Sequence, residues 1–260
     1  MAKINLVDFQ KRNLQSSYLV WYFVSKLINI RTSNCIEQRM LYLLYGIDKL
    51  GNRQVLGIYF DKKSDNRFWL ETFEDIKAKG VDNVMFLVTP ANRNIERCVK
   101  LVYNNIKIVK SPEDVMETIT KYFSDRLSRS LKISFKNLFL SSNIDTLNGE
   151  LQLFKDKYAH NKVILMLLER KEDLIKEFYQ YNYELRKFLY PYYAIRDMKK
   201  FLNKLNTLEK LCSNLTEIIE FCLPYVNTFE KGRSQYKEEW LNILSVLYEE
   251  YPEDMEVYIQ

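Results

Sequence analysis

The fold of this chain is limited first by the stretch 19–31. Residues 19–24 form an unbroken run of apolar, aromatic and β-branched side chains, and residues 27–31 continue it with apolar and polar side chains in alternation. β-branched and aromatic residues favour extended backbone, so a run of this kind predicts a long central strand. The first part of the chain is therefore expected to be built on a sheet.

Further strands and helices are predicted directly after this strand. Strands are expected at 40–47 and 54–60, joined by short loops as in an antiparallel meander. A helix is expected over 68–78, because its apolar residues recur at helical spacing, Asp65 can cap its start and Gly80 can end it. A strand at 83–88, a helix at 95–102 and a short strand at 106–109 follow. The order βββαβαβ resembles a ribonuclease-H-like core, an α/β fold in which the fourth strand returns parallel to the first.

The remainder of the chain is predicted to be helical. Helical spacing continues almost without interruption from 111 to about 183, and amphipathic segments follow at 208–212, 215–226 and 240–248. The pattern divides the chain into an N-terminal arm (1–17), the α/β core (18–110), a helical insertion (111–185), and a final core helix with C-terminal helices (186–260).

The composition agrees with a folded protein rich in helix. The chain has 260 residues, of which 47% are hydrophobic, so it can bury a sizeable core. Six glycines and five prolines are too few for many long loops. The net charge of +5 permits contact with nucleic acid or another anionic surface but does not require it.

The cysteines and the single histidine argue against several classes of site. Cys35, Cys98, Cys212 and Cys222 are widely spaced and form no Cys-x-x-Cys pair, and His160 stands alone. Zinc fingers and histidine-dependent triads therefore lack ligands or bases, and the cysteines are expected to be reduced and buried. No signal peptide and no membrane-length apolar run is found, so a cytoplasmic protein without membrane contact is expected.

Several motifs of this chain occur together in one known family. Residues 18–31 form the predicted central strand, residues 46–57 read Gly-Ile-Asp-x-x-Gly-x-Arg-x-Val-Leu-Gly, and Phe68 precedes Trp69. Arg186 and Tyr190 lie in a later basic stretch. This set resembles the catalytic domain of the mutator-type transposases of bacterial insertion sequences. The resemblance covers 9–110 well and 150–205 moderately, and the sequence begins almost where the family's catalytic domain begins.

The resemblance implies that the three acidic residues of the transposase active site are replaced. The aligned positions hold Val24, Pro90 and Arg196. Strand transfer of this type needs two divalent ions held by carboxylates, and valine, proline and arginine supply no such ligand. The sequence therefore predicts a protein that is not an enzyme and that holds no metal or other cofactor. An alternative is an active enzyme with relocated acids, for which Asp48, Asp61, Asp82, Glu96 and Asp197 are the candidates.

The basic stretch 185–205 suggests a function without catalysis. Its apolar residues recur at helical spacing while its cations fall on the polar side, which predicts a basic amphipathic helix able to follow DNA phosphates. The candidate DNA-binding residues are Lys187, Arg196, Lys199, Lys200, Lys204, Tyr190 and Tyr193. The first hypothesis is thus a catalytically inactive transposase-like protein that retains DNA binding or regulates transposition. The alternative is a protein-interaction module or inhibitor, acting through its C-terminal helices on another copy or on a partner such as a full-length transposase.

Overall fold

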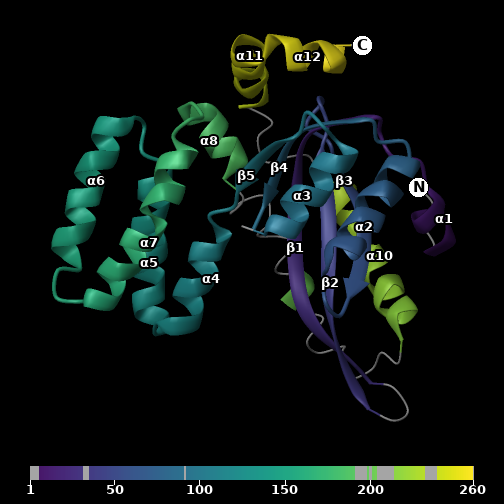
Figure 1. Cartoon of the computed structure of the whole chain (residues 1–260), viewed down its shortest axis with the longest axis horizontal. Coiled ribbons are helices and arrows are strands. Elements are labelled where there is room, and N and C mark those ends of the chain that lie inside the picture. The colour runs from purple at the N-terminus through teal and green to yellow at the C-terminus, as the bar shows by residue number, and fades with distance from the viewer. Residues whose placement is uncertain are drawn as a thin grey trace.

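The computed structural model describes residues 6–31, 35–90, 92–190, 198, 201–203, 214–231 and 239–259. Strands occupy the first part of the chain and helices the rest, as predicted (Figure 1). The elements are α1 (Leu6–Lys11), β1 (Ser17–Arg31), β2 (Ile36–Ile47), β3 (Arg53–Asp61), α2 (Asn66–Ala78), β4 (Asn83–Thr89), α3 (Arg93–Val102), β5 (Lys107–Lys110), α4 (Glu113–Tyr122), α5 (Asp125–Phe139), α6 (Ile144–Lys157), α7 (Lys162–Phe178), α8 (Tyr183–Leu189), α10 (Leu215–Lys231), α11 (Trp240–Glu250) and α12 (Pro252–Ile259).

The strands form a single five-stranded mixed sheet in the order β3-β2-β1-β4-β5. The first three strands are antiparallel neighbours, whereas β4 runs parallel to β1 and β5 parallel to β4. Helix α2 connects β3 to β4 and starts at its predicted cap, where the amide of Phe68 donates to Asp65 Oδ1 at 3.1 Å. Gly80 follows the helix with a φ of +100°, which favours glycine. The α/β class and the antiparallel meander are confirmed.

Residues 18–24 of the central strand β1 are buried on both faces of the sheet. On one face, Phe23 packs edge-on against Trp69 of α2, with the ring centroids 5.5 Å apart, and Trp21 packs against Tyr103 at 5.0 Å. The other face of β1 belongs to a larger apolar cluster that includes Tyr22 and residues from most of the later helices. Helices on both faces explain why residues 19–24 are apolar without interruption.

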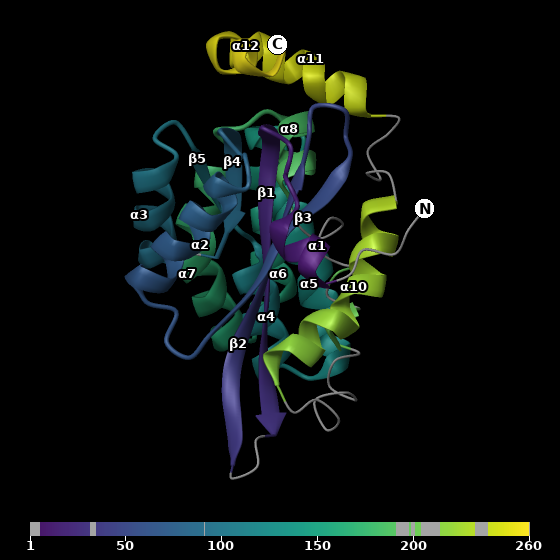
Figure 2. The same cartoon turned by 90° about the vertical axis from the view of Figure 1, so that its right-hand side faces the viewer.

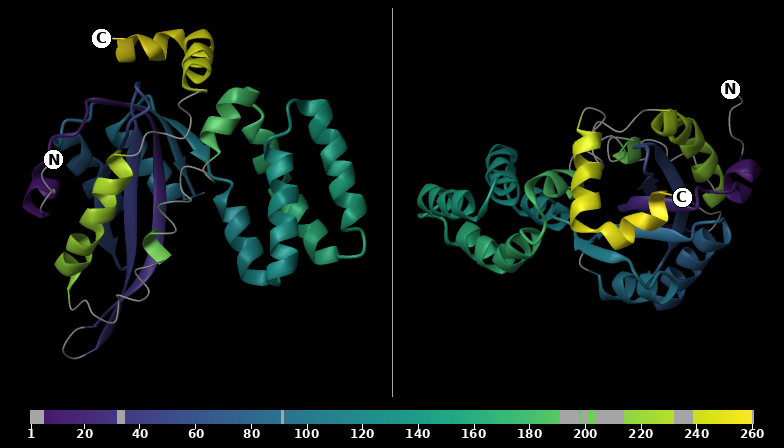
Figure 3. Two further views of the ribbon diagram at one scale, coloured as in Figure 1. Left: turned by 180° about the vertical axis from the view of Figure 1, so that it is seen from behind. Right: turned by 90° about the horizontal axis from the view of Figure 1, so that it is seen from above.

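Helices α4 to α8 follow β5 in the chain and form a lobe beside the sheet (Figure 1). Three asparagines divide the lobe into separate helices. The side chains of Asn143, Asn161 and Asn182 accept hydrogen bonds from the first turns of α6, α7 and α8. A view from above shows the lobe standing to one side of the sheet (Figure 3).

The later helices return to the sheet. Helix α10 contacts the edge strand β3, and α11 and α12 lie across one end of the sheet (Figure 2). There Trp240 donates its indole N–H to the carbonyl of Lys49 at 3.0 Å, and the Tyr258 hydroxyl donates to the carbonyl of Tyr18 at 3.1 Å. Both aromatic side chains are therefore used inside this molecule and are not exposed anchors for a partner.

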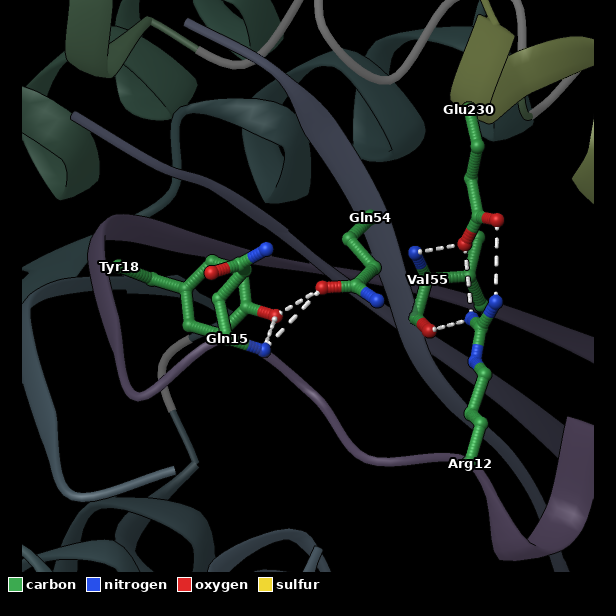
Figure 4. A network of polar contacts seen from close by, with 6 residues as sticks. All are labelled: Arg12, Gln15, Tyr18, Gln54, Val55 and Glu230. Atoms are coloured by element: carbon green, nitrogen blue, oxygen red, sulfur yellow. Dashed lines mark hydrogen bonds and ion pairs between the residues drawn. The ribbon is translucent and has the colours of Figure 1, made fainter. Parts of the chain in front are cut away.

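The outer edge of β3 is closed by side chains from both ends of the sequence (Figure 4). The amide of Val55 donates to Glu230 of α10 at 2.7 Å, and the carbonyl of Val55 accepts from Arg12. Arg12 also donates to both carboxylate oxygens of Glu230, at 3.0 and 2.7 Å. An edge strand normally leaves such backbone groups unpaired, so this arrangement protects the edge against pairing with another chain.

The expectation that the cysteines are buried holds only in part. Cys98 and Cys222 are buried as predicted, but Cys35 is exposed beside the hairpin between β1 and β2, and Cys212 lies outside the described residues.

Across the described ranges, no helix is long and apolar enough to traverse a lipid bilayer.

Candidate functional site

The two described positions of the replaced acids lie on neighbouring parallel strands. Tyr22 of β1 pairs with Val88 of β4. Two residues further along each strand bring Val24 level with Pro90, which directly follows the end of β4. The strand register therefore brings together two positions that are 66 apart in sequence (90 − 24), as the resemblance implies. Arg196, the third position, lies outside the described residues.

Val24 is buried among apolar side chains. Its side chain is 1% exposed and belongs to the same cluster as Met198 and Phe201, the described residues nearest in sequence to the third position. The Tyr22 hydroxyl next to it is satisfied by donating to the carbonyl of Phe188 at 2.7 Å. Neither Val24 nor Pro90 supplies an oxygen or nitrogen side-chain ligand, so this pair alone cannot coordinate a divalent ion.

The relocated acids proposed from the sequence are dispersed over the fold. Asp48 accepts the amides of Leu50 and Asn52 at 2.8 Å and so shapes the turn between β2 and β3. Asp61 accepts the amide of Lys63 at 3.0 Å after β3. The remaining acids are Asp82, exposed before β4, Glu96 in the first turn of α3, and Asp197, outside the described residues. In the part of the chain covered by the structure, no group of three or more His, Cys, Asp or Glu is arranged to hold a metal ion.

Two of the predicted DNA-binding residues are described, and both are engaged within the fold. Lys187 contacts Glu184 at 2.8 Å and Glu239 at 3.6 Å, and its hydrogen bond to Glu184 raises the pKa of its ammonium group. Tyr190 is 2% exposed, with its ring 6.1 Å from that of Phe139. A buried ring offers no face to a base, so the predicted stacking role of Tyr190 disagrees with its position.

The remaining predicted DNA contacts fall outside the described residues. They are Arg196, Lys199, Lys200, Lys204 and Tyr193. Of residues 191–205, the structure describes Met198, Phe201 and Leu202, which are buried, and Asn203, which is exposed. The apolar side of the predicted amphipathic helix thus faces the core, as its spacing indicated.

Arg186 has a role that the sequence did not reveal. Its side chain is almost fully buried, and it donates to the carbonyls of Tyr181 at 3.1 Å and Ser142 at 3.2 Å, and to that of Ser141. The guanidinium carbon lies 3.9 Å from the centre of the Tyr179 ring, and burial lowers the pKa of the group. These contacts fasten α8 to the loop before α6, at the base of an open cleft of about 410 Å³. Spacing on a helix gives no signal for a buried arginine whose partners are distant backbone carbonyls.

Comparisons with known proteins agree on one family. The family described as "Transposase, Mutator family" matches residues 2–219. The transposase for insertion sequence element IS905 of Lactococcus lactis is 19% identical over 239 residues, which cover 89% of this chain and 59% of the relative. The transposase for insertion sequence element ISRM3 of Rhizobium meliloti is 16% identical over 199 residues, covering 76% of this chain and 50% of the relative.

One solved structure gives only a weak likeness. It is a chain in the cryo-electron microscopy structure of the simian T-cell lymphotropic virus intasome in complex with PP2A regulatory subunit B56 gamma. The match has 12% identity and a TM-score of 0.26, and it covers 52% of this chain and 57% of that one. A sequence identity and a TM-score this low do not establish a shared fold.

These matches confirm the resemblance and correct one expectation. The chain spans 59% and 50% of the lengths of the two relatives above. The relatives are named transposases, which are enzymes, so the expectation from Val24, Pro90 and Arg196 that this protein is not an enzyme is overturned. The match over 2–219 covers most of the 260 residues, and this chain belongs to the mutator family of transposases.

Proposed function

We propose that this protein binds DNA and takes part in DNA transposition or in its regulation. The observation that carries the proposal is the family match over residues 2–219. The names of the relatives refer to transposases of insertion sequence elements, and a protein that handles such elements must contact their DNA.

The fold supports this proposal. The strand order β3-β2-β1-β4-β5, with β4 and β5 parallel to β1, is the order expected for a ribonuclease-H-like core, and we assign the core to that class. We also retain the predicted division into an arm (1–17), a core (18–110), a helical insertion (111–185) and a C-terminal part (186–260). In such a core, Val24 and Pro90 lie beside each other at the sheet positions where the family's first two acids belong.

The basic stretch 185–205 supports DNA as the ligand. Lys199, Lys200 and Lys204 follow one another within six positions, and Arg196 lies close before them in sequence. Cations in this density attract phosphates by releasing condensed counterions, so binding should weaken steeply with salt and depend little on base sequence. Lys187 contributes less to this charge because two carboxylates contact it.

The test is binding of the purified chain to a fluorescently labelled DNA duplex, followed by anisotropy at 50 and 200 mM salt. The variant Lys199→Glu/Lys200→Glu lowers the net charge by four. The matched control Lys155→Glu/Lys162→Glu lowers it equally at two exposed positions on α6 and α7. Each sample is measured with Mg²⁺ and with EDTA, and the DNA is then examined for strand breaks.

The proposal expects salt-sensitive binding that is at least about tenfold weaker in the Lys199/Lys200 variant than in the control. Absence of binding by the unaltered chain at 50 mM salt would overturn it. Strand breaks that require Mg²⁺ would demonstrate catalysis through acids at positions other than 24 and 90. The acids to vary next would be Asp48, Asp61, Asp82, Glu96 and Asp197.

A second candidate function is association with another protein or a second copy of the chain. Its support is a set of exposed apolar side chains on the C-terminal helices: Leu241 is 74% exposed, Val257 46% and Tyr248 41%. Exposed apolar groups of this size favour burial against a partner. The substitution Leu241→Asp should then dissociate a complex seen by analytical ultracentrifugation, either of this chain alone or with a transposase relative. A chain that is monomeric and binds no relative would exclude this function.

A further inference from the structure

Helix α5 carries a row of basic side chains that the sequence analysis did not single out. Arg126, Arg129, Lys132 and Lys136 follow one another at spacings of three, three and four residues, against one acid, Asp125, in the first turn. At about 100° per residue these four positions fall within about 120° of the helix circumference, and they span about 15 Å along the axis. The row is therefore a continuous strip of positive charge.

The strip lies on the solvent side of α5. The opposite side of the helix is formed by Leu131, Phe135 and Leu138, all 0% exposed, which hold α5 in the lobe. Arg126 and Arg129 are exposed, and Lys132 is partly exposed. Among the side chains that the structure describes, none forms an ion pair with these three cations, whereas Lys176 of α7 contacts Glu172 at 2.9 Å. Their charge is left for an external partner.

The net positive charge of the lobe is concentrated on this helix. Helix α4 carries three acids and one base, and helices α6 and α7 carry acids and bases interspersed along their length. Helices α11 and α12 at the other end of the chain have two and three acids, respectively, and no base. Because the net charge of the whole chain is only +5, a strip of four cations with one acid differs from an average surface.

An exposed aromatic residue adjoins the strip. Tyr122 ends α4, with two residues between it and the start of α5, and is 68% exposed. The ammonium group of Lys121 lies 5.4 Å from the centre of the Tyr122 ring, which places a fifth cation beside the start of the strip. A tyrosine hydroxyl among cations is a common donor to phosphate oxygens.

We propose that the α5 strip, defined as Arg126, Arg129, Lys132 and Lys136 with Lys121 and Tyr122, is a second DNA-binding surface that contacts the phosphate backbone of a duplex. The proposal rests on the proposed function, since it takes DNA as the partner, and adds a surface on the lobe, separate in sequence from 185–205. A row of cations along one helix face suits the closely spaced phosphates of a duplex better than the isolated carboxylates of a folded protein partner.

The test compares two variants that change the net charge equally. Arg126→Glu/Arg129→Glu/Lys132→Glu reverses the strip, and the control Lys155→Glu/Lys162→Glu/Arg170→Glu reverses three exposed cations of α6 and α7. Binding of the full chain to a labelled duplex is titrated at several salt concentrations. Circular dichroism of each variant confirms that the lobe remains folded, and the substitution of the same three strip residues by Gln serves as a milder second variant.

The strip variant should bind at least about tenfold more weakly than the control, and the slope of log K against log salt should fall by about 2.7 for three lost phosphate contacts. The Gln variant should shift both quantities in the same direction. Equal weakening of strip variant and control, or an unchanged salt slope in the folded strip variant, would overturn the α5 surface while leaving the proposed function intact. An unaltered chain that binds no duplex would overturn both.

Discussion

Arg12 and Glu230, which are 218 positions apart in the sequence, form an ion pair with two hydrogen bonds across the backbone of Val55 (Figure 4). The side chains are only 14% and 17% exposed. Because both ions are largely removed from water and also bind the edge strand, the pair differs from an ordinary surface ion pair. It holds the N-terminal segment, β3 and α10 together.

Arg12→Ala should lower the free energy of unfolding by about 1–3 kcal/mol, since it leaves the Glu230 carboxylate and the Val55 carbonyl without their donor. Urea denaturation measures the change. The control is Arg67→Ala, which removes an ion pair of the same 2.7 Å length whose side chains are 84% and 59% exposed. That variant should lose clearly less stability than Arg12→Ala, because solvent screens an exposed ion pair. Equal losses in the two variants would contradict a special role for Arg12.

Gly51→Ala should destabilise the packing of α11 on the sheet. Gly51 has a φ of +76°, and an added Cβ would lie 3.2 Å from the Trp240 ring. The combined backbone and steric cost should be about 1–3 kcal/mol, and it should appear as a shift in tryptophan fluorescence and earlier thermal unfolding.

Substitution of Gly149 by alanine is a control for Gly51→Ala, because its expected change in stability has the opposite sign. Gly149 lies within α6, and an added Cβ would meet no atom within 4 Å. Gly149→Ala should therefore stabilise the chain by about 0.5–1 kcal/mol. A Gly51→Ala variant as stable as the unaltered chain would show that α11 adjusts to the added methyl group.

Arg186→Lys should loosen the junction between α8 and the loop before α6. An ammonium group cannot donate in the fork geometry that reaches the carbonyls of Tyr181 and Ser142 together, so about 2–3 kcal/mol of stability should be lost. Hydrogen exchange should accelerate around Ser141 and Ser142. Arg170→Lys, at an exposed position of α7, should change neither quantity.

Stability should fall at alkaline pH because of buried tyrosines. Burial raises the pKa of Tyr181 to about 12, and burial also raises the pKa of Tyr18, Tyr103 and Tyr258 above the ordinary value of 10. These groups keep their protons longer when folded, so their contribution is complete below pH 10 and is lost as the pH rises through the folded pKa values. Circular dichroism and the absorbance of tyrosinate should therefore change together above pH 10. Titration of all tyrosines near pH 10 with the fold intact would contradict this.

Much of the core was predictable because short-range patterns determine it. The unbroken apolar run 19–24, the Asp65 cap and the Gly80 stop gave the central strand and α2 within two residues of their observed ends. The positions Val24 and Pro90 came from the family resemblance, and extending the parallel register of β1 and β4 by two residues brings them level.

The rest depends on long-range contacts that spacing does not encode. The burial of Tyr190 against Phe139 and the second ion pair of Lys187, with Glu239, join residues about fifty positions apart in sequence. The burial of Trp240 likewise depends on a distant partner, the carbonyl of Lys49, which lies 191 positions away in sequence. The α5 strip was visible as spacing, but only packing reveals which side of the helix remains in solvent.

The hydrogen bond from Tyr258 to Tyr18 has a consequence for the order of folding. It joins residues 240 positions apart, and Tyr18 belongs to the central strand. Closing so long a loop is entropically costly until intervening elements have shortened it, so docking of α12 should be among the last steps of folding. During synthesis, the end of β1 that α12 covers must therefore remain exposed until some 240 further residues have been made.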